Sequence, residues 1–268
     1  MPDPSAATTS RWNDLRDRAA SSAAMVVIGI FAVHFGGVWF QMLTVFVTAI
    51  LMWELARMIR PESIVFSMML AAGTASILSG LLGTQEQWFL LLIFLPAILG
   101  TFAMSRERLT FFCFAVMIVA AGWGLVSFRD EYGGIWLYWL ILVVIATDVL
   151  GYFAGKSIGG PKFWPRVSPK KTWSGTAAGW IGAGLVGALF LVFTDAGWGL
   201  VWVSMLLSLA SQMGDIAESA LKRRMGVKDS SALIPGHGGL FDRFDGLLGA
   251  SLFLLVIALF VDIPRVDL

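Results

Sequence analysis

Residues 134–154 read GIWLYWLILVVIATDVLGYFA, an apolar stretch in which Asp148 is the one formally charged residue. A helix needs about 20 consecutive apolar residues to cross the roughly 30 Å hydrocarbon core of a bilayer, so this stretch predicts a transmembrane helix. A carboxylate inside such a helix is costly and usually faces a partner, a cavity or an ion. Gly151 and Gly155 follow Asp148 at i+3 and i+7, which would let another helix or a ligand approach that face closely.

Apolar runs of the same kind extend in both directions from this stretch. They lie near residues 21–37, 40–58, 64–83, 87–104, 109–128, 174–194, 198–220 and 247–262. Of the 268 residues, 57% are hydrophobic and 14% are charged, with a mean hydropathy of +0.79, which sets the chain apart from soluble domains. We expect an all-α, polytopic integral membrane protein with about nine transmembrane helices.

The basic residues predict how these helices are oriented. If the N-terminus lies inside, all 19 Lys and Arg residues except Arg129 and Arg265 fall inside. Cytoplasmic loops carry an excess of Lys and Arg, so we expect the N-terminus to be cytoplasmic, with residues 1–20 as a retained tail. Residues 21–268 then form one transmembrane catalytic domain, whose C-terminal half, about residues 140–250, carries the active site.

Cysteine and histidine are scarce. Cys113 is the single cysteine, and His34 and His237 are the two histidines. A disulfide or a thiolate cluster within one chain is therefore excluded, and an imidazole-rich metal site is not expected. A bound metal would need oxygen ligands, which favours a hard cation such as Mg²⁺. We expect no nucleic-acid partner.

The run at residues 198–220 ends in a polar stripe. Ser211, Asp215, Glu218 and Lys222 occur at i, i+4, i+7 and i+11, so a helix places all four on one face. We expect this face to line a polar cleft that opens to the cytoplasm. The alternative is internal salt bridging, in which Lys222 pairs with Asp215 or Glu218, although one lysine cannot neutralise three acids.

Two long loops on the expected cytoplasmic side, at residues 155–173 and 222–246, are dense in Gly, Pro and charge. Long ordered loops in a compact protein are usually functional. The first combines glycines with five cations, a composition that suits phosphate binding, although a loop that only sets membrane orientation would look the same. In the second, Asp242 and Asp245 begin the last apolar run, where either helix capping or Mg²⁺ binding explains them.

The stretch SALKRRMGVKDSSALIPGHGGLFDRFD, residues 219–245, resembles the complete signature of the phosphatidate cytidylyltransferases. Three further segments look like segments of the same family: QMGD at 212–215 with Glu218, Asp148 with Gly151 and Tyr152, and SPKKTW at 168–173. Ser174 departs from the pattern, because the family usually carries Glu there. The resemblance is close over the second half of the chain, while the first five apolar runs match only as apolar spans.

This resemblance implies a membrane enzyme that transfers the cytidylyl group of CTP to phosphatidic acid, giving CDP-diacylglycerol and diphosphate. It implies a bacterial-type cytoplasmic membrane, with the active site facing the cytoplasm. It also implies Mg²⁺ as the cofactor, a second, monovalent cation such as K⁺, and a homodimer surrounded by membrane lipids.

Roles for individual residues combine the resemblance with the charge pattern. We expect the metal ligands to be the carboxylates of Asp148, Asp215, Glu218, Asp242 and Asp245. We expect the catalytic residues to be Asp215, Lys222, Asp242 and Asp245. We expect the substrates to contact Lys170, Lys171, Thr172, Ser219, Arg223, Lys228, His237, Gly238, Gly239 and Arg243. His237 has two open roles, donation to a phosphate oxygen or rigidification of the glycine-rich turn.

Two other functions are compatible with the sequence. A CTP-dependent kinase or cytidylyltransferase of an isoprenoid lipid would also need a membrane cleft, CTP and Mg²⁺, and the kinase would require a general base for a neutral hydroxyl. An ion-coupled transporter would use Asp148, Asp215 and Glu218 as a cation relay. That last function leaves the glycine-rich loop without a role.

Overall fold

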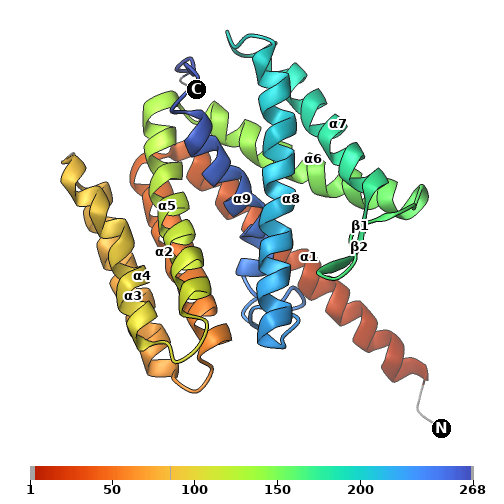
Figure 1. Cartoon of the computed structure of the whole chain (residues 1–268). Coiled ribbons are helices and arrows are strands. Elements are labelled where there is room, and N and C mark those ends of the chain that lie inside the picture. Colours follow the sequence, from red (N-terminus) through yellow and green to blue (C-terminus); the bar gives the residue numbers. More distant parts are fainter. Residues whose placement is uncertain (1–3, 85, 267–268) are drawn as a thin grey trace.

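The computed structural model describes residues 4–84 and 86–266, which form a bundle of helices with one short β-hairpin (Figure 1). In chain order the elements are α1 (Pro4–Phe35), α2 (Gly37–Ile59), α3 (Ile64–Leu82), the 3₁₀ helix η1 (Gln87–Ile93), α4 (Phe94–Ala103), α5 (Arg108–Tyr132), α6 (Ile135–Ser157), β1 (Lys162–Trp164), β2 (Ser168–Thr172), α7 (Trp173–Phe190), α8 (Gly199–Met225) and α9 (Phe241–Ile257).

The fold class expected from the sequence is confirmed. Within residues 4–84 and 86–266, five helices are long and apolar enough to cross a membrane, namely α2, α3, α5, α6 and α8, and shorter apolar helices cover Ala19–Phe35 and Trp88–Ala103. Large apolar side chains face outward, where a soluble protein would place polar ones; Trp88 and Phe102 are 81% and 80% exposed. The protein is therefore an integral membrane protein. Nine crossings and the side on which the N-terminus lies stay predictions.

Two helices begin earlier than their apolar runs. α1 begins at Pro4 rather than near residue 21, so most of the expected tail is helical. α9 begins at Phe241 rather than near residue 247, so Asp242 and Asp245 lie in its first turns. Helical backbone hydrogen bonding does not require apolar side chains. Apolar length therefore underestimates the length of a helix that has a polar end.

The loop at residues 155–173 contains a β-hairpin that the sequence analysis did not predict. β1 pairs antiparallel with β2, with Lys162 opposite Thr172 and Trp164 opposite Ser168. The hydroxyl of Thr172 accepts a hydrogen bond from the backbone N–H of Gly175 at 3.2 Å, so it caps α7. The hairpin thus joins α6 to α7 as an ordered element, and β2 lies in contact with α8.

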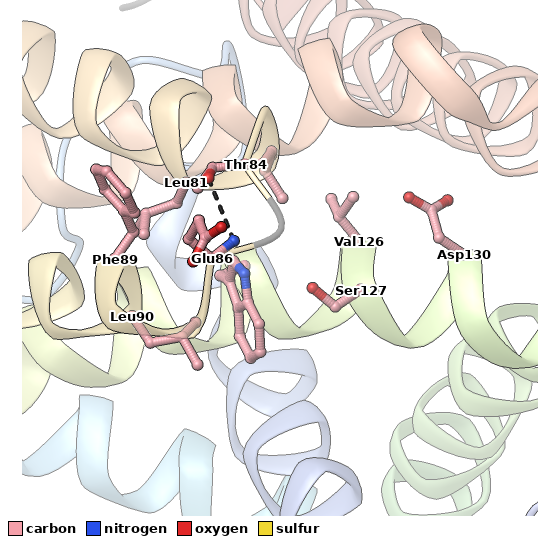
Figure 2. Close-up of a pocket in the computed structure, with 10 residues that line it drawn as sticks. Leu81, Thr84, Glu86, Phe89, Leu90, Val126, Ser127 and Asp130 are labelled. Carbon is pink, nitrogen blue, oxygen red and sulfur yellow. Dashed lines mark hydrogen bonds between the residues drawn. The ribbon is translucent and has the colours of Figure 1, made fainter.

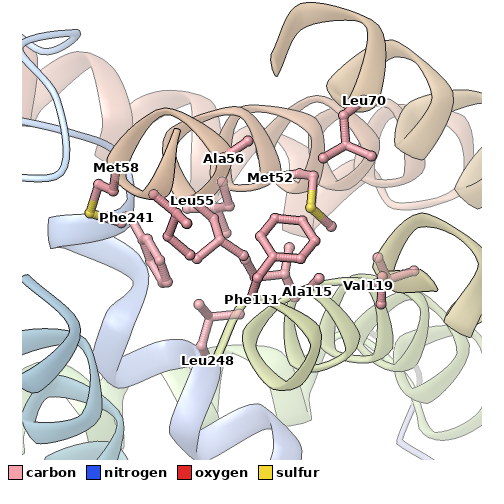
Figure 3. Packing of buried hydrophobic residues seen from close by; sticks show 14 of the residues in the cluster. Met52, Leu55, Ala56, Met58, Leu70, Phe111, Ala115, Val119, Phe241 and Leu248 are labelled. Atoms are coloured by element: carbon pink, nitrogen blue, oxygen red, sulfur yellow. The ribbon is translucent and has the colours of Figure 1, made fainter. Parts of the chain in front are cut away.

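The apolar core on one side of the bundle brings together α2, α5 and α9 (Figure 3). Leu55 of α2, Phe111 of α5 and Phe241 of α9 are fully or almost fully buried there. The rings of Phe114 and Phe241 meet edge to face with centroids 6.1 Å apart. Phe241 therefore anchors the first turn of α9 on its apolar side.

Glycines set the distances between the helices around the polar residues. A Cβ on Gly175 of α7 would lie 2.5 Å from the carbonyl oxygen of Gly151 and 3.3 Å from Cα of Gly155, both on α6. The close approach expected at Gly151 and Gly155 is confirmed. In the same way, α8 and α9 meet through Gly214 and Gly249, where a Cβ on Gly249 would lie 2.9 Å from Cα of Gly214.

Replacing Gly249 by Ala is expected to lower the stability of the protein by about 1–3 kcal/mol, the usual cost of overpacking. The added methyl group would meet backbone atoms of α8, which cannot move aside as a side chain can. Chemical unfolding in detergent micelles measures the change. Gly73→Ala in α3 is the matched control, because a Cβ there meets nothing within 4 Å. Equal stability of the two variants would contradict the close α8–α9 contact.

Candidate active site

The residues singled out from the sequence gather at one end of the bundle, where α8 ends, α9 begins and the hairpin follows α6 (Figure 1). A cavity between α3, η1 and the C-terminal half of α5 contains none of them (Figure 2). It is lined by Leu81, Leu82, Thr84, Glu86, Phe89, Leu90, Trp123, Val126, Ser127 and Asp130. The candidate site is therefore separate from this cavity and consists of side chains in direct contact with one another.

Lys222 connects the end of α8 to the beginning of α9. Its Nζ atom lies 2.5 Å from Oε2 of Glu218 and 2.6 Å from Oδ1 of Asp242. The side chains of Glu218 and Asp242 are 1% and 6% exposed. The salt bridge considered between Glu218 and Lys222 is thus present, and it extends to a second acid on another helix. One ammonium group between two buried carboxylates holds these helix ends together.

Asp242 also orders the loop at residues 226–240, hereafter the signature loop. Its Oδ2 atom accepts hydrogen bonds from the backbone N–H of Ser230 at 2.9 Å, from Ser230 Oγ at 3.0 Å and from the backbone N–H of Gly239 at 2.8 Å. Burial raises the pKa of Asp242, but Lys222 and the backbone N–H groups of Ser230 and Gly239 outweigh it and hold the pKa below its usual value. Both of its oxygens are engaged, so as a metal ligand Asp242 would have to exchange a partner.

A second cluster surrounds Asp215, about one turn before Glu218 along α8. Lys171 of the hairpin places Nζ 2.5 Å from Oδ2 of Asp215, and Ser219 Oγ donates to its Oδ1 at 3.2 Å. Asp148 of α6 and Asp245 of α9 lie close enough for their charges to interact with that of Asp215. The tertiary structure thus joins three acids, from α6, α8 and α9, and one lysine, from the hairpin.

Among the described residues, the charge of this second cluster is unbalanced. Lys171 pairs with Asp215, and Lys222, whose charge also acts on Asp245, is already bonded to Glu218 and Asp242. Nearby, Ser211 Oγ is buried and has no hydrogen-bond partner among the described residues. Oxygen donors with excess negative charge fit a hard cation. In the part of the chain that the structure describes, however, no three such groups converge at the distances of a preformed metal site.

The residues expected to contact the substrates occupy three kinds of position. Four cations are exposed around the site, namely Lys170, Arg223, Lys228 and Arg243. Thr172 is buried, and its hydroxyl caps α7, so it does not face a substrate in this structure. Gly238 and Gly239 belong to the tight turn of the signature loop, where Ile234 and Gly238 form an isolated β-bridge.

His237 of the signature loop contacts α1 through its ring. Ser21 Oγ is 2.9 Å from its Nδ1 atom, and Ser22 Oγ is 3.1 Å from its Nε2 atom. Its backbone oxygen accepts a hydrogen bond from Arg243 at 2.8 Å. With both ring nitrogens engaged, His237 fits the role of rigidifying the turn, and donation to a phosphate would require its release from α1.

One buried acid near the site was missed by the sequence analysis. Glu54 lies on α2, is 0% exposed and accepts hydrogen bonds from the signature loop and from the start of α9. A signal for it was present, because it is a carboxylate within the apolar run at residues 40–58. The criterion that singled out Asp148 would have found Glu54 as well.

Comparison with known proteins extends the resemblance to most of the chain. The model of the cytidylyltransferase family matches residues 16–261. The phosphatidate cytidylyltransferase of Brucella abortus (strain 2308) is 34% identical over 251 residues, which cover 90% of this chain and 92% of the relative. That of Bacillus subtilis (strain 168) is 40% identical over 135 residues, 49% of this chain and 50% of the relative. That of Staphylococcus aureus (strain COL) is 39% identical over 160 residues, 56% of this chain and 61% of the relative.

Proposed function

The chain belongs to the cytidylyltransferase family, and we propose that it transfers the cytidylyl group of CTP to phosphatidic acid, giving CDP-diacylglycerol and diphosphate. The observation that carries this activity is the meeting of Lys171 and Asp215 beside Asp148 and Asp245, with exposed cations around them. Such a site can bind phosphate groups and a divalent cation at the same time.

The reaction needs positioning more than it needs a base. A phosphate oxygen of phosphatidic acid forms the new bond to the α-phosphorus of CTP, and the bond from that phosphorus to the diphosphate breaks. The nucleophile is already an anion, so no side chain has to remove a proton from it. The protein has to hold two polyanions that repel each other and to offset the charge on the departing diphosphate. Lys170, Arg223, Lys228 and Arg243 suit this task.

We propose Asp148, Asp215 and Asp245 as the residues that would hold Mg²⁺, because together they carry more negative charge than Lys171 offsets, while Lys222, which also acts on Asp245, is paired with Glu218 and Asp242. Mg²⁺ held there would supply positive charge to offset the negative charge of the substrate phosphates. Asp242 could join them only by exchanging one of its present partners, whereas Glu218 contacts Lys222 through Oε2 and keeps Oε1 without a hydrogen-bond partner among the described residues. A second, monovalent cation such as K⁺ and a homodimer in the membrane remain part of the proposal.

Turnover by the purified protein in detergent tests this function. With CTP, Mg²⁺ and phosphatidic acid we expect diphosphate and CDP-diacylglycerol in equal amounts. A CTP-dependent lipid kinase would instead release CDP and would respond to a polyprenol rather than to phosphatidic acid. A transporter would leave CTP intact. Either of these two results would overturn the proposed function.

We also propose that the site faces the cytoplasm, since the basic residues gather on that side. In a Cys113→Ala background, cysteines introduced at Lys162 and Lys228 should react with a membrane-impermeant maleimide only from the cytoplasmic side. A cysteine at Asp195, in the connection between α7 and α8, should react only from the other side. The reverse pattern would place the site away from cytosolic CTP and overturn the orientation.

A further inference from the structure

Glu54 is a buried carboxylate on a helix that is long and apolar enough to span the membrane. Placing a carboxylate in such a position costs free energy unless hydrogen bonds or charges compensate for it. The ion pairs of the described residues do not include Glu54, and its partners are neutral donors. Hydrogen bonds from those neutral donors therefore have to compensate for the cost of burying the Glu54 carboxylate.

Four donor atoms surround the Glu54 carboxylate. Oε1 accepts from Ser231 Oγ at 2.5 Å and from the backbone N–H of Leu240 at 2.9 Å. Oε2 accepts from the backbone N–H of Phe241 at 2.6 Å and lies 3.3 Å from Ser230 Oγ, whose single proton it shares with Asp242. Two donors belong to the middle of the signature loop and two to the point at which α9 begins.

Glu54 thus performs from another helix the task of an N-cap. Leu240, the N-cap residue of α9, has no side-chain oxygen and makes no capping hydrogen bond of its own. The N-terminus of a helix carries free N–H groups and a partial positive charge, which a carboxylate satisfies. Phe241 is held on its other side by the apolar core, where it lies beside Leu55 and Met58 of α2 (Figure 3). α2 therefore fixes where α9 starts.

The Glu54 network is continuous with the Lys222 network. Ser230 Oγ lies between the two carboxylates, 3.3 Å from Oε2 of Glu54 and 3.0 Å from Oδ2 of Asp242. Asp242 follows Phe241 directly, so the position of the first turn of α9 sets the position of its carboxylate. The backbone at Gly239 packs against this network so closely that a Cβ there would lie 2.5 Å from Oε1 of Glu54, which leaves room only for glycine. A displacement at Glu54 would thus be passed on to the Asp242–Lys222 pair.

We propose that Glu54 is a positioning residue for cytidylyl transfer. It holds the signature loop and the start of α9 in place, so that Asp242 and Lys222 keep their positions relative to the substrates. This inference rests on the proposed function. Glu54 itself is fully buried and contacts protein groups, so it acts through the loop. Small displacements in a reacting site are expensive, since about 1 Å can lower a rate by about 100-fold.

The test compares Glu54→Gln with Glu62→Gln. Gln keeps the size of Glu54 but replaces one of its two acceptor oxygens by an amide N–H₂, so the donors on that side face another donor and lose their acceptor. We expect kcat per folded protein to fall about 10-fold to 100-fold, at a temperature well below the unfolding midpoint of the variant. The same change at Glu62, whose side chain is 65% exposed, should leave kcat within about twofold. An effect on stability alone would lower the midpoint but leave this kcat unchanged, which would overturn the positioning role.

A second variant keeps the test decisive if Glu54→Gln does not fold. Ser231→Ala removes one donor of the network, and its kcat should fall about fivefold, the factor that corresponds to about 1 kcal/mol for one lost hydrogen bond. Where both variants fold, the double variant should lose less than about twofold beyond Glu54→Gln, because Ser231 acts through Glu54. Losses that multiply in full, or a Ser231→Ala variant with wild-type kcat, would overturn the inference. Wild-type protein that made no CDP-diacylglycerol would overturn the proposed function instead.

Discussion

An Asp215→Asn protein is expected to insert and fold normally but to lose cytidylyl transfer by about 100-fold or more, the scale seen when one preorganised electrostatic group is removed from an active site. Asp215 is the point at which α8, the hairpin and two further acids meet. Asn keeps the size and removes the charge, so both the grip on Lys171 and the attraction for a cation are lost. Synthesis of CDP-diacylglycerol from CTP and phosphatidic acid measures the change, and added Mg²⁺ should restore little of the rate.

Asp195→Asn is the matched control, since Asp195 is exposed in the connection between α7 and α8 and the variant should keep its activity.

Asp242→Asn tests whether Asp242, on α9, is a metal ligand. If Asp242 only orders the signature loop, most activity should survive, because the Asn oxygen can still accept from the N–H groups of Ser230 and Gly239, although the ion pair with Lys222 is lost. If Asp242 is a metal ligand, as the sequence analysis predicts, turnover should be abolished. Near-normal activity of the Asp215→Asn protein would contradict the proposed cation site at Asp148, Asp215 and Asp245.

A Lys222→Met protein is expected to be less stable than wild type by about 3–5 kcal/mol, the cost of leaving a buried charge without its partner. The change exposes no new surface, but it strands two acids, Glu218 and Asp242, that are almost fully buried. The ends of α8 and α9 then repel each other where Lys222 had joined them. Chemical unfolding in detergent micelles measures this loss, and turnover should fall with it because the signature loop is no longer held.

Lys170→Met provides the comparison, because Lys170 is exposed on the hairpin and its replacement should change stability by less than about 0.5 kcal/mol. Adding Glu218→Gln to Lys222→Met should recover part of the lost stability, since one of the two stranded charges is removed. A Lys222→Met protein as stable as wild type would mean that Lys222 does not bridge these carboxylates.

The sequence by itself determined the features that depend on local periodicity. Apolar runs predicted the helices because about 20 apolar residues suffice to cross a bilayer, whatever the neighbouring helices are. The spacing of Asp215, Glu218 and Lys222 predicted a common face because 3.6 residues make one helical turn. The stretch at residues 219–245 carried the family resemblance, which the family comparison confirmed over residues 16–261. The metal and substrate roles of individual residues stay predictions.

Only the tertiary structure decided which charged groups meet. From the sequence, Lys222 could pair with Asp215 or Glu218 on its own helix face. In the structure it pairs with Glu218 and with Asp242, which is 20 residues away. Lys171 reaches Asp215 because an unpredicted hairpin carries it there. Glu54 meets the signature loop across more than 170 residues of chain. Such partners depend on how closely helices pack, here through Gly214 and Gly249, and no local period encodes that distance.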